Sequence, residues 1–218
     1  MINFPAIGES IRADFESRTA ARDQALLQTR QLTRLAAHTI RAIHRSESAE
    51  AHALLAEARD LVQAIRAALK GFPDLYFAGY TQDAIKEFAE ASLTVALIEN
   101  APLPSVKDLQ VEPACYINGM AETIGELRRR CLDILRQGYS SEAERLLTCM
   151  DEIYALLVTL DYPDAITNGL RRQTDLVRGI IERTRADLTL SLREQRLQES
   201  MQRFAERLPP PDESHADD

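Results

Sequence analysis

The stretch RQLTRLAAHTIRAIHR, from Arg30 to Arg45, decides the fold class because its residues repeat with the period of an α-helix. At about 100° per residue, one side of that helix carries the apolar and small residues Leu32, Leu35, Ala36, Thr39 and Ile43. The opposite side carries Arg30, Arg34, Arg41 and Arg45, within about 60° of one another. The segment Pro5–Arg45 has no interior proline, so the pattern predicts one long helix with a buried face and a cationic face.

Proline and glycine divide the rest of the chain into further helical segments. We expect helices over Ser48–Lys70, Thr81–Glu99 and Cys115–Arg136, with Ser48 as the N-cap of the first of these. A further helix is expected from a Ser141–Glu144 capping box to Leu160, and a last long helix from Pro163 to about Leu208. The connection Pro102–Pro113 predicts the longest loop. The sequence therefore predicts an all-α protein, an elongated bundle of six or seven helices with long first and last helices.

The composition supports this fold class and excludes several others. Among 218 residues, hydrophobic residues make up 45%, charged residues 28% and aromatic residues only 6%, which is typical of a globular chain but too poor in strand formers for a sandwich or barrel. The net charge is −8, and half of that excess comes from Asp212, Glu213, Asp217 and Asp218. We expect one helical domain over residues 1–208 and a disordered acidic tail over residues 209–218.

The chain shows no sign of export or membrane insertion. Asn3, Pro5 and Glu9 stand where a signal peptide needs an apolar run, and apolar stretches such as Tyr154–Leu160 are too short to cross a bilayer. Three cysteines, Cys115, Cys131 and Cys149, form no CxxC pair and are typical of core residues in a reducing compartment. We therefore expect a cytoplasmic protein with no membrane partner.

Arginine dominates the cations, with only three lysines among 26 basic residues. No acidic residue lies at comparable angles within the first stripe, Arg30 to Arg45, which favours a phosphate-binding surface over a solvated face. A second stripe consists of Arg171, Arg178, Arg185, Arg193 and Arg196, and it also contains Asp175 and Glu182. This second stripe predicts either an ion-paired surface or an interface. Genomic GC bias is an equally good explanation of the arginine content alone.

Two pairs of glutamates carry the candidate chemistry. Glu87 and Glu90 are three residues apart on the third predicted helix, and Glu122 and Glu126 are four apart on the next. If these helices pack antiparallel with the two faces opposed, four carboxylates meet and can bind Mg²⁺ or Mn²⁺. The alternative is that the pairs are ordinary surface ion pairs, Glu126 with Arg130 and Glu90 with Lys86.

Other chemistries lack their motifs. The sequence has no glycine-rich nucleotide loop, no HExxH zinc motif and no Glu-x-x-His of a ferritin-like bundle. The four histidines, His38, His44, His52 and His215, have no metal-ligand spacing with the cysteines.

Four segments, taken together, resemble the translin/Trax family. They are RQLTRLAAHTIRAIHR (Arg30–Arg45), KEFAEA (Lys86–Ala91), YINGMAETIGEL (Tyr116–Leu127) and DAITNGLRRQTDLVRGIIERTR (Asp164–Arg185), in the family's order and spacing. The resemblance spans nearly the whole chain up to the proline run. It implies a seven-helix, translin-like domain over residues 1–208 and assembly into hollow octamers that bind single-stranded or short duplex nucleic acid inside.

The resemblance also implies roles for the glutamates. Trax-type subunits cut RNA with Mg²⁺ through an E-x-x-E pair on one helix and a D/E-x-x-x-E pair on the next, whereas translin-type subunits lack these acids. The pairs correspond here to Glu87 and Glu90, and to Glu122 and Glu126. Two positions depart from the Trax pattern: Glu122 replaces an aspartate, and Ala84 replaces an acid, with Asp83 beside it.

Residues and resemblance together predict a Mg²⁺-dependent endoribonuclease, acting as a homo-oligomer, an octamer by resemblance. The predicted metal ligands and catalytic residues are Glu87, Glu90, Glu122 and Glu126, with Mg²⁺ or Mn²⁺ as cofactor. The predicted contacts to the RNA backbone are Arg30, Arg34, Arg41, His44 and Arg45. Single-stranded DNA stays open as a further ligand. The alternatives are a non-catalytic nucleic-acid-binding octamer and, from another class, a helical scaffold that binds proteins.

Overall fold

The computed structural model describes residues 3–207, which form nine helices and no strand, so the all-α expectation is confirmed. Six helices are long: α1 (Phe4–His44), α2 (Ser48–Ala68), α4 (Gly79–Ile98), α6 (Pro113–Leu135), α7 (Ser141–Leu157) and α9 (Leu170–Ala205). Three are single turns: α3 (Pro73–Tyr76), α5 (Val106–Leu109) and α8 (Asp164–Thr167). The first and last helices are the longest, with 41 and 36 residues, as predicted. The predicted acidic tail, residues 209–218, lies outside the described residues.

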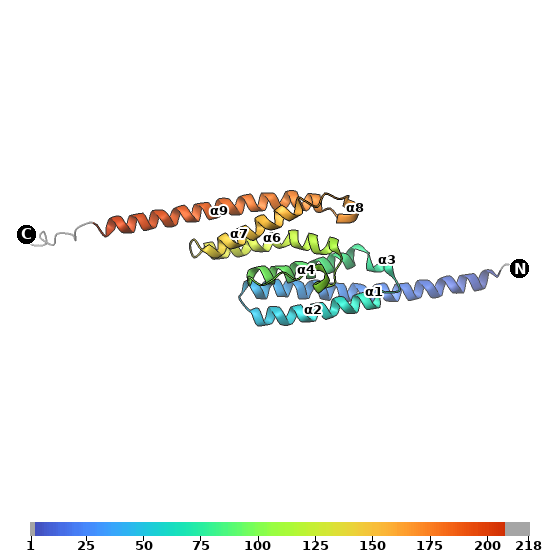
Figure 1. The fold of residues 1–218 in the computed structure, drawn as a ribbon. Helices are drawn as coiled ribbons and strands as arrows, with labels where there is room; N and C mark the ends of the chain where they lie inside the picture. Colours follow the sequence, from blue (N-terminus) through green and yellow to red (C-terminus); the bar gives the residue numbers. More distant parts are fainter. Residues whose placement is uncertain (1–2, 208–218) are drawn as a thin grey trace, which may run out of the picture.

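The helices stack in layers along one direction (Figure 1). Helix α1 packs against α2 and α4, α4 packs against α6, and α6 packs against α7 and α9. The N-terminal turns of α1 and the C-terminal turns of α9 extend beyond this body at opposite ends, which makes the subunit elongated. None of the helices within residues 3–207 is both long and apolar enough to span a membrane.

Helix α4 is the central wall of the molecule because it contributes to both main apolar clusters. Ile85 and Phe88 pack with residues of α1 and α2, such as Leu32. Leu93 instead packs with residues of α6 and α7, such as Ile124. A helix that is apolar nearly all round is a buried helix, and any charge on it is held in a poorly solvated environment.

Helices α4 and α6 approach each other closely at Gly119. A Cβ atom at this position would lie 2.9 Å from the backbone nitrogen of Glu90 and 2.9 Å from the backbone oxygen of Lys86. Contacts that short do not occur for real Cβ atoms, so only glycine allows this approach. Gly119 therefore fixes the register of α6 on α4 at the level of the glutamates.

Some predicted boundaries were wrong. The last helix does not run unbroken from Pro163, because Asn168 and Gly169 adopt left-handed conformations, with φ of 52° and 83°, and separate α8 from α9. The loop Pro102–Pro113 contains the turn α5, which begins at a Ser105–Asp108 capping box.

Two predicted helix caps were also wrong. Helix α7 is capped by Ser140 rather than by a Ser141–Glu144 box, because Ser140 is the extended residue whose hydroxyl accepts from the Glu142 N–H. Helix α2 has Glu47 at its N-cap position, and the Ser48 hydroxyl donates instead to the Glu99 carboxylate.

Candidate functional site

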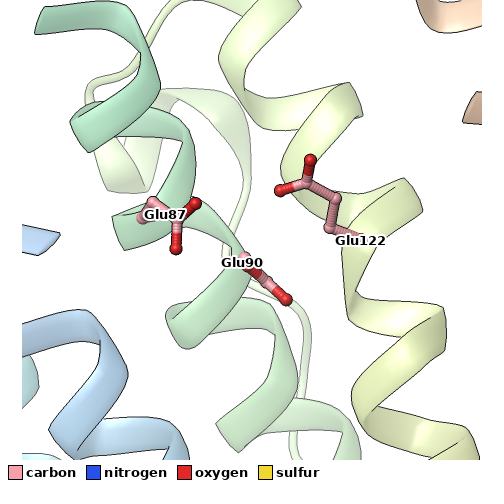
Figure 2. Close-up of side chains that lie close together, drawn as sticks. All are labelled: Glu87, Glu90 and Glu122. Atoms are coloured by element: carbon pink, nitrogen blue, oxygen red, sulfur yellow. The ribbon is translucent and has the colours of Figure 1, made fainter. Parts of the chain in front are cut away.

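Three carboxylates converge between α4 and α6 (Figure 2). Glu87 and Glu90 come from α4, Glu122 comes from α6, and one oxygen of each lies within 4.8 Å of the others. The three-residue spacing puts Glu87 and Glu90 on one side of α4. The close approach at Gly119, one turn before Glu122, brings the third carboxylate across to them. We call these three residues the acidic trio.

The acidic trio is partly buried, and Glu90 is its most buried member, with 9% of its surface exposed. Burial raises the pKa of Glu90 to about 8, and the charges of Glu87 and Glu122 act in the same direction. The pKa of Glu87 is also raised, again mainly by burial, although the charge of Lys86 opposes the shift. Burial therefore disfavours the charged forms of Glu87 and Glu90.

One lysine and one glutamine bind the Glu122 carboxylate. The Lys86 Nζ atom lies 2.7 Å from Glu122 Oε1 and 3.8 Å from Glu87 Oε1. The Gln173 Nε2 atom donates to the same Glu122 oxygen at 3.1 Å. Burial lowers the pKa of Lys86, but the hydrogen bond and charge of Glu122 outweigh that effect and the pKa is raised. Lys86 thus pairs with Glu122 and Glu87 rather than with Glu90, the partner considered from sequence.

Glu126 lies one turn beyond Glu122 and is held by His44 from α1. The His44 Nε2 and Glu126 Oε2 atoms are 2.6 Å apart, and the Arg129 guanidinium lies 3.5 Å from the same oxygen. The hydrogen bond from His44 is the main cause of a lowered pKa of Glu126. Glu126 pairs with these two groups instead of Arg130 and is not among the carboxylates whose oxygens lie within 4.8 Å of one another, although its charge adds to the effect of burial on the pKa of Glu90. The structure therefore brings three of the four predicted ligands together within 4.8 Å.

The arginine stripe of α1 is exposed on the side away from the core. Within residues 3–207, Arg30, Arg34 and Arg41 form no ion pair, whereas Arg45 pairs with Glu47 at 2.7 Å. His44, predicted to contact RNA with them, has a side chain only 3% exposed and faces Glu126. Because His44 touches Glu126, the C-terminal end of α1 lies next to this carboxylate.

The second stripe, on α9, is largely ion-paired. Its pairs are Arg171 with Asp161, Arg178 with Glu182, and Arg185 with Asp151. Of the two readings left open by the sequence, these contacts favour the neutralised surface.

Sequence reasoning missed the groups that position the acidic trio. Gln173 lies 51 residues after Glu122, and nothing local to α9 marks it as a partner. Gly119 had one available signal, since an isolated glycine inside a helical pattern indicates a close backbone approach. Ala84 is 2% exposed and lies in the core, whereas Asp83 beside it is exposed on the side of Lys86 and Glu122.

Comparisons with known proteins identify the family. No family model matches the chain. The uncharacterised protein MJ0175 of Methanocaldococcus jannaschii is 34% identical over 190 residues, which cover 86% of this chain and 83% of that protein. AfC3PO has been solved both alone and in a complex with duplex RNA. It is 34% identical to this chain, and the match covers 84% of this chain and 95% of the AfC3PO chain, with a TM-score of 0.79. The chain belongs to the translin/C3PO family.

This assignment confirms the resemblance drawn from the four sequence segments. Apo-NeC3PO has the same fold, with a TM-score of 0.78 at 19% sequence identity. That match covers 88% of this chain and 98% of the NeC3PO chain. The translin-type fold thus tolerates wide sequence change.

Proposed function

We propose that this translin/C3PO-family chain is a Mg²⁺-dependent endoribonuclease that binds single-stranded or short RNA inside a hollow homo-oligomer. The observation that carries the proposal is the convergence of Glu87, Glu90 and Glu122 within 4.8 Å. The unpaired arginines Arg30, Arg34 and Arg41 lie on the same helix as His44, which contacts Glu126, and they supply a positive surface for the phosphates. The existence of an AfC3PO complex with duplex RNA supports RNA as the ligand class.

The donor set of the acidic trio suits a hard divalent cation. Carboxylate oxygens are the ligands that Mg²⁺ and Mn²⁺ prefer, and a bound cation would offset the burial and the neighbouring charges that raise the pKa of Glu90. Glu87, Glu90 and Glu122 would hold Mg²⁺ or Mn²⁺, which would supply Lewis-acid chemistry at a phosphoryl oxygen and offset the negative charge that repels a phosphodiester.

The remaining residues of the site divide the other tasks. Glu126, kept ionised by the hydrogen bond from His44, is the group suited to accept the proton of the attacking water. Lys86 pairs with Glu122 in the metal-free site and would be available to the phosphate when a cation holds that carboxylate. Arg30, Arg34, Arg41 and Arg45 hold the sugar-phosphate backbone without reading bases.

Two exposed apolar stripes support assembly of several copies. Phe4, Ile7, Ile11 and Phe15 lie on one side of the projecting end of α1, and Leu197, Met201 and Phe204 lie on one side of the projecting end of α9. Apolar rows of this kind on free helical arms are typical of interfaces. We assign them to contacts between copies in a homo-oligomer, an octamer as the family resemblance implies.

A cleavage assay tests the function directly. Parent protein and the Glu126→Ala variant are incubated with a labelled single-stranded RNA across a Mg²⁺ titration, with EDTA as the metal-free arm. We expect the parent to cut only with the divalent ion, and Glu126→Ala to lose cutting by at least about a hundredfold while still binding RNA in a gel-shift assay. Glu152→Ala, which removes an exposed glutamate of α7, serves as the matched control.

The outcomes separate the candidate functions. Cutting by Glu126→Ala at the parent rate would show that the assignment of Glu126 is wrong. A parent that binds RNA but never cuts it would be the non-catalytic binder. Phosphate contacts require the logarithm of the affinity to fall linearly with the logarithm of the salt concentration, so the absence of binding at low salt would leave the scaffold.

A further inference from the structure

A small polar cavity of about 90 Å³ opens beside the acidic trio. Lys86 and Glu122 form the wall that it shares with the site, and Asp83, Asn118, Asn168 and Gln173 form much of the remainder. Most of its lining side chains carry amide, carboxylate or ammonium groups, which suit the hydroxyl groups of a sugar.

Asn118 is the most informative residue of this cavity because it is only 4% exposed yet incompletely hydrogen-bonded. Its Nδ2 atom donates to the backbone oxygens of Ala114 and Thr167, at 2.9 and 2.7 Å. These two acceptors use both amide hydrogens and fix which way the amide group points. The Oδ1 atom accepts no hydrogen bond from any residue within 3–207, so it is the polar atom that Asn118 offers to the cavity.

The neighbouring groups determine which ligand chemistry fits. Asp83 adds an exposed carboxylate acceptor that forms no ion pair with the described part of the chain. Gln173 uses one amide hydrogen on Glu122 and keeps a second for a ligand. Two carboxylates in the wall repel a phosphate group, whereas acceptors beside a free donor suit a hydroxyl, which both donates and accepts.

We propose that this cavity binds the ribose of a nucleotide next to the scissile phosphate, and that Asn118 Oδ1 accepts the hydrogen bond from its 2′-hydroxyl. The inference rests on the proposed nuclease function, since the cavity shares Lys86 and Glu122 with the acidic trio. The 2′-hydroxyl is the group that distinguishes RNA from DNA at such a site. A 2′-deoxy sugar leaves the Asn118 oxygen without this hydrogen bond, and we expect a strand that carries it there to be cleaved about 10- to 100-fold more slowly.

The test varies the sugar and the protein together. A short RNA strand is compared with a series in which one 2′-deoxynucleotide is moved position by position, and both cleavage rate and affinity are measured with Mg²⁺. For the parent, we expect the cleavage rate to fall only when the deoxynucleotide adjoins the cut. The Asn118→Leu variant has a side chain of similar shape but no acceptor. For this variant, the ratio of the cleavage rate of the all-RNA strand to that of the deoxy-substituted strand is expected to fall close to one.

A matched control separates recognition from stability. Thr123→Val removes a hydroxyl from the same helix that donates to the Gly119 carbonyl, and Thr123 does not line the cavity. A change that only destabilises α6 slows cleavage of the all-RNA and deoxy-substituted strands equally. The Thr123→Val variant is therefore expected to keep the ratio of the two cleavage rates that the parent shows. If Asn118→Leu does not fold, the parent series alone decides, because a parent indifferent to every single deoxy substitution overturns the inference.

The two proposals can fail separately. If the 2′-deoxynucleotide slows cleavage by Asn118→Leu as much as it slows cleavage by the parent, the cavity assignment is wrong and the nuclease proposal stands. If the parent cuts no strand, the affinities decide: equal binding of both sugars overturns the cavity assignment as well. If the parent binds the all-RNA strand more tightly than the deoxy-substituted strand and Asn118→Leu abolishes this difference, the cavity assignment stands even without catalysis.

Discussion

Glu90 is a charged residue placed on the most buried helix of the molecule, and this placement links stability to metal binding. Its carboxyl has a pKa of about 8 in the folded protein, mainly because of burial, against an ordinary value of 4.5. Between those two values the folded state holds a proton that the unfolded state has lost. The free energy of unfolding therefore falls as the pH rises through this window.

The Glu90→Gln variant tests this linkage. Glutamine keeps the shape and removes the charge, so at about pH 9 the metal-free variant is expected to be more stable than the parent by on the order of a few kcal/mol. At about pH 5, where Glu90 is protonated in the folded parent, the difference nearly vanishes. Thermal unfolding at both pH values measures it, with Glu152→Gln as an exposed control. A variant less stable than the parent at high pH would contradict the raised pKa of Glu90.

His44 acts at the same scale by holding Glu126. Its ring is buried, and its Nε2 atom lies 2.6 Å from the carboxylate. Partners that orient a catalytic or ligand group typically change activity by about 10- to 100-fold when they are removed.

We therefore expect His44→Ala to lower the RNA cleavage rate by about 10- to 100-fold at saturating Mg²⁺, with gel-shift affinity for RNA nearly unchanged. His44→Gln keeps a side-chain donor and is expected to recover part of the rate. Loss of RNA affinity with an unchanged cleavage rate would instead support the sequence-based prediction that His44 contacts the RNA backbone.

At the scale of helices, the site depends on how closely α6 approaches α4. The contacts of 2.9 Å that a Cβ atom at Gly119 would make involve the backbone of Lys86 and Glu90, which cannot move aside as a flexible side chain can. Widening this contact moves Glu122 away from its two partners on α4.

Gly119→Ala is expected to cost about 1–3 kcal/mol of stability and to weaken Mn²⁺ binding. Gly125→Ala, in the same helix, is the matched control, because its Cβ meets no atom within 4 Å. That control is expected to be neutral or to stabilise by up to about 1 kcal/mol, since alanine favours the helix. Chemical denaturation and calorimetric titration measure the two effects. Equal stability of the two variants would rule out Gly119 as the contact that sets the helix spacing.

The sequence predicted the long helices and the two glutamate pairs because both follow from local periodicity. It did not predict the break at Asn168 and Gly169, where the left-handed turn was hidden inside a favourable helical pattern. Helical spacing offered Arg130, four residues away, as the alternative partner of Glu126, whereas the structure pairs Glu126 with His44, which is 82 residues away. Which groups meet across helices depends on the rotation and spacing of packed elements, and no local pattern encodes that.

At the scale of the whole molecule, the projecting arms of α1 and α9 leave apolar side chains uncovered in a single copy. Phe4 and Phe15 are 72% and 64% exposed, and they lie on the same side of a helix that extends beyond the body. In the homo-oligomer proposed above, contact between copies would cover this apolar surface.

We expect the double variant Phe4→Asp, Phe15→Asp to dissociate the homo-oligomer into smaller species without unfolding the helices. Ala13→Asp adds charge on the opposite side of the same arm and is expected to leave assembly unchanged. Analytical ultracentrifugation gives the mass, and circular dichroism checks the helix content. An unaltered assembly in the double variant would exclude the α1 arm from the interface.

The central claim is that Glu87, Glu90 and Glu122 share a cation. Calorimetric titration of the RNA-free protein with Mn²⁺ tests it most directly, on the parent and on Glu122→Gln. We predict saturable binding to the parent that strengthens from about pH 6 to about pH 9, as Glu90 loses its proton more readily, and at least about tenfold weaker binding to Glu122→Gln. Equal Mn²⁺ affinity of parent and variant, or no saturable binding to either, would contradict the account.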